Sequence, residues 1–241
     1  MVNIRKSQER GHANHGWLDS YHSFSFAHYY DPEFMGYSVL RVINEDIVAP
    51  ARGFGMHPHR DMEIVTYMLS GALQHKDSLG NGSVIRAGDV QRMTAGTGIV
   101  HSEFNASDAE PAHLLQIWLL PESNNLTPGY EEKHFDQQGK TNHWQLIASP
   151  DSREGSLKIH QDVNLLATYL EQGKALAYRA AAAGRSFYLQ LAKGSLLVNG
   201  KTLIAGDAVA IDDAASIEIE AIENAEALLF DLPAHSASTR H

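Results

Sequence analysis

The chain of 241 residues is long enough for one large β domain or two smaller ones. Its 19 basic and 29 acidic residues give a formal net charge of -10, which argues against nucleic acid or an anionic membrane as a partner. The sequence contains no cysteine, which excludes disulfides and thiolate metal ligands. It also has no signal-type apolar run at its start and no stretch near the ~20 apolar residues needed to span a bilayer. We therefore expect a soluble cytoplasmic protein.

Short apolar or alternating runs separated by turn residues dominate residues 38–120, a pattern typical of an antiparallel β sandwich or barrel. Strands are predicted at 39–43, 63–69, 71–75, 90–93 and 113–120. The Gly-Asn-Gly tract at 80–82 favours a hairpin, because it tolerates positive φ. After Pro121 the chain is polar up to residue 142 and contains Pro128 and Gly129, so we place the connection between two domains there. The expected domains are residues 1–130 and 131–241.

The second half repeats the order of the first. A strand, a glycine, a hairpin and a Gly-Asp pair occur at 67–71, 80–82 and 88–89, and again at 187–194, 198–201 and 206–207. This order predicts two copies of one β module. No histidine occurs between Phe187 and Asp231, whereas the first half is rich in them. Only the first copy is therefore expected to hold a histidine site.

Two short clusters in the first half carry the chemistry: His57-Pro58-His59 and His101-Ser102-Glu103. Side chains alternate along a strand, so each pair is expected to project from one face. Three neutral imidazoles and one carboxylate suit a divalent transition metal such as iron, nickel, copper, manganese or zinc, and they leave coordination positions open. The pattern predicts a catalytic metal site rather than a structural one. His75 and His113, on other predicted strands, are expected to be hydrogen-bonded core histidines.

The spacing of these clusters resembles the two sequence motifs of the cupin superfamily: Gly53-x3-His57-x-His59-x3-Glu63, and Gly88-x5-Thr94 leading through a Gly-Thr-Gly tract to His101-x-Glu103-x-Asn105. More narrowly, the chain is similar to the pirins. That resemblance extends through Arg10-Gly11-His12, Ser23-Phe24-Ser25-Phe26, Tyr29-Tyr30-Asp31-Pro32 and Leu115-Gln116-Ile117-Trp118. It is dense over residues 1–121 and looser beyond them.

The resemblance implies an all-β bicupin, with two antiparallel β-barrel or jelly-roll domains of which only the N-terminal one binds metal. It implies ligands at His57, His59, His101 and Glu103, with iron as the first expectation. Glu63, a ligand position in many other cupins, is expected to be structural here, with ligation as the alternative. Phe54, Met56 and Met93 are expected either to line a substrate pocket or to pack in the core.

The implied activity is that of a metal-dependent quercetin 2,3-dioxygenase, which uses O2 to open the heterocyclic ring of a flavonol and releases carbon monoxide. Glu103 would accept the proton of the substrate 3-hydroxyl. The alternative function is a redox-sensing regulatory module that binds a protein partner without turnover. A second alternative is a dioxygenase that acts on a different enolisable aromatic substrate.

Overall fold

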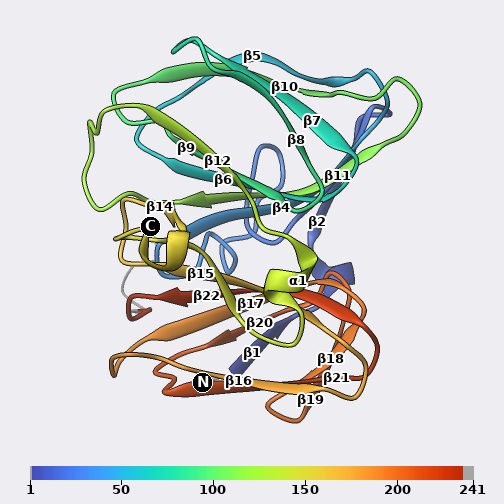
Figure 1. Ribbon diagram of the computed structural model, residues 1–241, viewed down its shortest axis with the longest axis vertical. Coiled ribbons are helices and arrows are strands. Elements are labelled where there is room, and N and C mark those ends of the chain that lie inside the picture. The colour runs from blue at the N-terminus through green and yellow to red at the C-terminus, as the bar shows by residue number, and fades with distance from the viewer. Residues whose placement is uncertain (1, 236–241) are drawn as a thin grey trace.

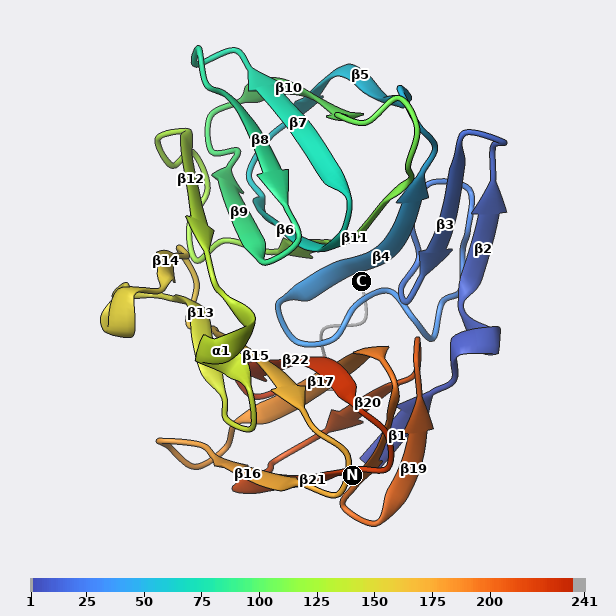
Figure 2. The ribbon, with the colours of Figure 1, turned by 45° about the vertical axis from the view of Figure 1, so that its right-hand side comes forward.

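The protein consists of two stacked β-sandwiches, as shown by the computed structural model, which describes residues 2–235 (Figure 1). Each sandwich pairs a seven-stranded sheet with a four-stranded one. The two large sheets face each other at the centre, and the small sheets lie at opposite ends (Figures 1 and 2). The predicted all-β fold with two domains is confirmed.

The N-terminal sandwich contains the predicted strands of the first half. In spatial order its large sheet comprises β12 (Gly129–His134), β9 (Asp89–Thr94), β6 (Glu63–Ser70), β11 (Ala112–Leu119), β4 (Leu40–Val48), β3 (Leu18–His22) and β2 (Gly11–Asn14). Its small sheet comprises β5 (Gly53–His59), β10 (Ile99–Asn105), β7 (Ala72–Asp77) and β8 (Gly82–Arg86). The expected hairpin at 80–82 connects β7 to β8.

The C-terminal sandwich has the same layout. Its large sheet comprises β1 (Val2–Arg5), β20 (Ala208–Ile211), β17 (Ser186–Lys193), β22 (Ala225–Leu232), β15 (Asn164–Leu170), β13 (Gln145–Ser149) and β14 (Leu157–Lys158). Its small sheet comprises β16 (Ala175–Arg179), β21 (Ser216–Ala221), β18 (Ser195–Val198) and β19 (Lys201–Ile204). Helical turns occur at η1 (Ser7–Glu9), α1 (Gln137–Lys140) and η2 (Arg153–Gly155). The β13–β14 pairing is parallel, an exception to the expected antiparallel pattern.

The internal repeat is visible in the strand order. β6 to β9 and β17 to β20 occupy corresponding places, and Gly71 and Gly194 follow the first strand of each set with φ of 75° and 79°. A Cβ on Gly194 would lie 2.0 Å from the backbone oxygen of Asn224, so the turn admits no side chain. Each glycine thus lets its chain turn tightly from the large sheet into the small one.

Two strands cross the expected division of the domains. β1 pairs with β20, so the first residues of the chain extend the C-terminal sheet. β12, in the segment expected to connect the domains, pairs with β9 and forms the edge of the N-terminal sheet. Its polar sequence obscured it, because the side chains of an edge strand are largely exposed. The expected boundary at residue 130 therefore falls inside β12, and the division at that residue stays a prediction.

The interiors of the two sandwiches differ in chemistry. A large apolar cluster between the domains includes Val65, Tyr67, Leu165 and Phe230. The C-terminal interior is a second, continuous apolar core. The N-terminal interior instead holds two small apolar clusters at separate places and buries polar residues such as His75, Gln91, His101 and Glu103. Because burying polar groups is unfavourable unless they are paired, this interior is expected to be functional.

Candidate metal centre

The strands β5 and β10 bring the two predicted clusters side by side. In the register of this antiparallel pair, His101 lies opposite His57 and Glu103 lies opposite Phe54. Two residues of β5, Gly55 and Met56, therefore lie opposite the single Ser102 of β10. This two-to-one arrangement is a β-bulge. Beside this bulge, the Gly55 carbonyl oxygen lies 2.7 Å from Nδ1 of His57 and orients that ring.

Three of the four expected ligands form one compact group. The candidate ligand nitrogens of His57, His59 and His101 lie within 4.8 Å of one another. His57 and His59 are half-buried, whereas His101 is 1% exposed. The group is therefore open to solvent on the β5 side and closed on the β10 side.

Burial keeps the imidazoles of His59 and His101 neutral, the state in which they bind metal. It lowers the pKa of His59 to about 4, to which the nearby His57 contributes. It lowers the pKa of His101 to about 3, and the charges of His57 and His59 act in the same direction. Both ring nitrogens of His101 are buried without a hydrogen-bond partner in the described structure. A metal ion would bind one of these two nitrogens, so His101 fits a metal ligand.

Glu103 lies deeper in the sandwich than the histidine group. It is 2% exposed, and its carboxylate accepts hydrogen bonds from Gln116 at 2.8 Å and, more weakly, from Thr66 and Gln91 at 3.4 Å. Burial raises its pKa to about 7, to which the charge of Asp46 contributes, while the three hydrogen bonds act in the opposite direction. A carboxyl group that changes charge near neutral pH is suited to proton transfer.

Glu103 forms a second compact group, with His101 and His75. Candidate ligand atoms of these three residues also lie within 4.8 Å of one another. The structure thus divides the expected residues between two overlapping groups that share His101, and it adds His75. His75, expected to be a hydrogen-bonded core histidine, is hydrogen-bonded to Asp77, and it also lies in the site. His113, by contrast, bonds to Glu45 in the large sheet.

Glu63 lies on the other side of its sheet. It is separated by three positions from Thr66, which contacts Glu103, so its side chain projects from the opposite face of β6. There its carboxylate accepts a hydrogen bond from the backbone N–H of His160 at 3.1 Å. This position supports the structural role expected for Glu63.

The residues expected near a substrate have different surroundings. Met93 is fully buried in a small apolar cluster, Met56 is 61% exposed, and Phe54 packs against Trp17. Trp118, which the sequence analysis did not single out for the site, lies with its ring 4.9 Å from that of His59. Trp118 lies two residues after Gln116 on β11 and so projects from the same face, and this alternation was the available signal.

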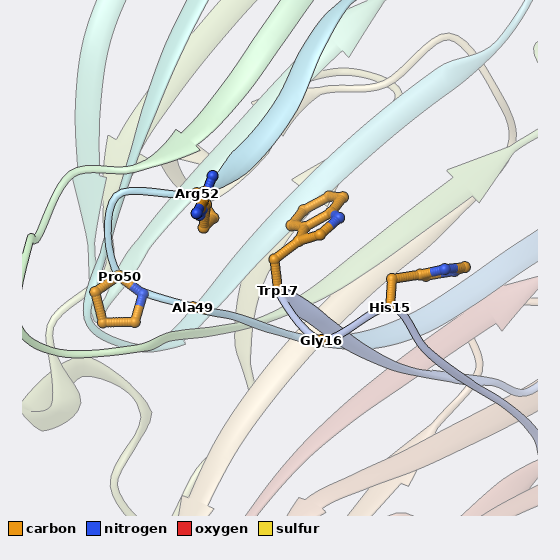
Figure 3. A pocket seen from close by; sticks show the side chains of 6 residues that line it. All are labelled: His15, Gly16, Trp17, Ala49, Pro50 and Arg52. Atoms are coloured by element: carbon orange, nitrogen blue, oxygen red, sulfur yellow. The ribbon is translucent and has the colours of Figure 1, made fainter.

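A surface hollow of about 450 Å³ lies outside the histidine group, between the loop before β3 and the loop before β5. It is lined by His15, Gly16, Trp17, Ala49, Pro50 and Arg52 (Figure 3). None of the expected ligands lines it. The hollow is therefore not the candidate metal centre.

Two stacked sandwiches of like topology, with a histidine cluster in the N-terminal one, define the class of this protein as a bicupin. The sequence pattern of the family described as Pirin matches residues 3–119, and that of the "Quercetinase C-terminal cupin domain" matches residues 146–232. The chain belongs to the pirin family. The helices in the described part of the chain are short, and none could cross a membrane.

Relatives match over nearly the whole chain. A protein of Escherichia coli named quercetin 2,3-dioxygenase is 52% identical over 234 residues, which cover 97% of this chain and 99% of that protein. The crystal structure of YhhW from Escherichia coli superposes with a TM-score of 0.93 at 51% identity, covering 98% of this chain and all of that one. A structure titled as bacterial pirin YhhW in complex with nickel(II), also from Escherichia coli, has a TM-score of 0.92 at 50% identity and covers 97% and 100% of the two chains.

Proposed function

We propose that this protein is a metal-dependent dioxygenase that uses O2 to cleave a flavonol such as quercetin, with release of carbon monoxide. The observation that carries the proposal is the group of His57, His59 and His101 beside the buried Glu103. The name of the Escherichia coli relative supports the same activity and favours it over a regulatory module that binds a protein partner. A cytoplasmic location stays a prediction.

His57, His59, His101 and Glu103 are proposed to bind one divalent transition-metal ion. Neutral imidazoles and a carboxylate suit iron, the first expectation, and equally nickel, copper, manganese or zinc. The nickel complex of the relative supports a site of this type. A bound ion would act as a Lewis acid toward a substrate oxygen.

Glu103 is proposed to be the catalytic base. Its pKa of about 7 lets the carboxylate accept a proton from the substrate hydroxyl at neutral pH. Gln116 holds one carboxylate oxygen at 2.8 Å and so fixes the orientation of the group. Trp118, next to His59, offers an aromatic surface for a flat polyphenol.

Anaerobic reconstitution with iron, nickel, copper or manganese, followed by quercetin turnover and carbon monoxide detection, tests this function. Carbon monoxide in stoichiometric yield with one of the metals is expected. Metal binding without turnover of quercetin or of a panel of other enolisable aromatics would contradict the enzymatic role.

Variants test the residue assignments. His101→Ala should lose bound metal and activity together, whereas Glu103→Gln should keep much of the metal and lose turnover. Glu63→Gln is the matched control and should retain the metal. Full metal occupancy in His101→Ala, or unchanged kcat in Glu103→Gln, would refute the assigned roles.

A further inference from the structure

His75 is a fully buried histidine at the centre of the N-terminal sandwich. On β7 it lies directly opposite Glu103 of β10, and its ring centroid is 5.4 Å from that of His101. The corresponding strand of the C-terminal sandwich, β18, fills its interior with Leu196 and Val198 instead. An apolar side chain would therefore serve packing at this place, so the imidazole calls for another explanation.

Asp77 selects the tautomer of that imidazole in its neutral form. Its Oδ2 lies 3.0 Å from Nε2 of His75, and a carboxylate at this distance accepts the Nε2 proton. The backbone N–H groups of Leu79 and Asn81 hold the other oxygen, Oδ1, at 2.9 and 3.0 Å. With the proton on Nε2, Nδ1 of His75 carries a lone pair.

Nδ1 of His75 is buried and has no hydrogen-bond partner among the described residues. The ring cannot turn easily toward another partner, because Tyr130 stacks on it at 4.6 Å and the Tyr130 hydroxyl is tied to Ser83 at 2.6 Å. An immobilised imidazole with a carboxylate on one nitrogen and an unused lone pair on the other has the arrangement typical of metal-binding histidines.

We infer that His75, together with His101 and Glu103, forms an inner binding position for a divalent transition-metal ion. The outer position is the metal site proposed above, on which the inference rests; there His57, His59 and His101 form the compact group and Glu103 is the fourth proposed ligand. Candidate ligand atoms lie within 4.8 Å of one another in each group. Because His101 belongs to both groups and Glu103 is the one carboxylate in either, the site has ligands and negative charge for one ion at a time.

The two positions share His101 and Glu103 and differ in their other imidazole ligands. An ion in the outer position would be held by His57 and His59 on the side of the site that is open to solvent. An ion in the inner position would be held by the buried His75 instead. The His75 imidazole thus sets the metal affinity of the inner position relative to that of the outer position, on the substrate side.

Titration with Co2+, followed by its absorption spectrum and by metal analysis, tests the inner position without any assay of activity. The wild type should bind one equivalent. The double variant His57→Ala/His59→Ala should still bind one equivalent, more weakly and with a changed spectrum. Adding His75→Ala should weaken that binding by a further factor of at least about ten. Adding His113→Ala, the matched control with its own carboxylate partner outside the site, should change nothing.

Asp77→Asn in the double variant gives a second measurement that retains the His75 ring. An amide that donates to Nε2 would place the proton on Nδ1 and should weaken Co2+ binding by a similar factor. Absence of binding in the double variant, or equal affinity with and without His75, would overturn the inner position while leaving the outer site intact. No binding by the wild type would instead overturn the proposed metal site itself.

Discussion

Replacing Glu103 by glutamine should change how the stability of the metal-free protein depends on pH. Burial raises the pKa of the folded carboxyl to about 7, against an ordinary value of 4.5. Between these values the folded chain binds more protons than the unfolded chain, so the unfolding free energy falls as the pH rises. The difference corresponds to about 3 kcal/mol lost by the wild type above pH 7. Glu103→Gln removes this loss.

Urea unfolding in the presence of a chelator, followed by tryptophan fluorescence at pH 5 to 8, measures the effect. Wild type and variant should be similar at pH 5, and the variant should be more stable by about 3 kcal/mol at pH 8. Asp46, whose pKa burial raises to about 6, contributes in the same direction in both proteins. Parallel pH profiles for the two proteins would refute the reasoning. Saturating divalent metal should favour the wild type, because the ion offsets the buried carboxylate charge.

Two further substitutions test a buried ion pair and the close packing of two strands at the site. Lys140→Met removes the cation 2.8 Å from the buried Glu226 carboxylate. Urea unfolding should show a loss of about 2 to 4 kcal/mol in the unfolding free energy. Lys174→Met, at an exposed position, is the control and should change the unfolding free energy little. Equal effects of the two would argue against a stabilising role for this buried ion pair. Gly53→Ala would place a Cβ 2.2 Å from a backbone oxygen of β10. It should lower the unfolding free energy by about 1 to 3 kcal/mol and weaken metal binding. Gly55→Ala is the control, because a Cβ there would meet no atom within 4 Å. Metal titration and thermal unfolding compare the two, and equal metal affinities would show that the spacing of β5 and β10 does not control the site.

Alternation along single strands was enough to predict that His57 and His59 share a face, because that geometry is local. The pairing of their strand with β10 was implied by the family resemblance and not by any local signal. The bulge at Gly55 and Met56 was also beyond local reasoning, since it depends on the register between two strands distant in sequence. Because of this bulge, Glu103 lies opposite Phe54 and not opposite Gly55.

His75 was not expected in the site for the same reason, because its position there depends on the pairing of strands distant in sequence. Its spacing from Asp77 matches that of His101 from Glu103, and this repeated pattern was the available signal. The sequence did not show that β7 pairs with β10. This pairing places His75 opposite Glu103. The expectation of a hydrogen-bonded core histidine named no partner, and it did not include the unpaired nitrogen that the described structure leaves on this ring.

The pairing of β1 with β20 has a consequence for how the protein is made. During translation, residues 2–5 leave the ribosome long before their partner strand has been synthesised. The N-terminal sandwich can form while this short strand remains unpaired, because domains generally fold in order of synthesis. The C-terminal sheet gains its edge strand only when nearly the whole chain is available. The beginning of the chain thus closes the domain that is finished last, so an interrupted translation product cannot complete the sheet to which its own first residues belong.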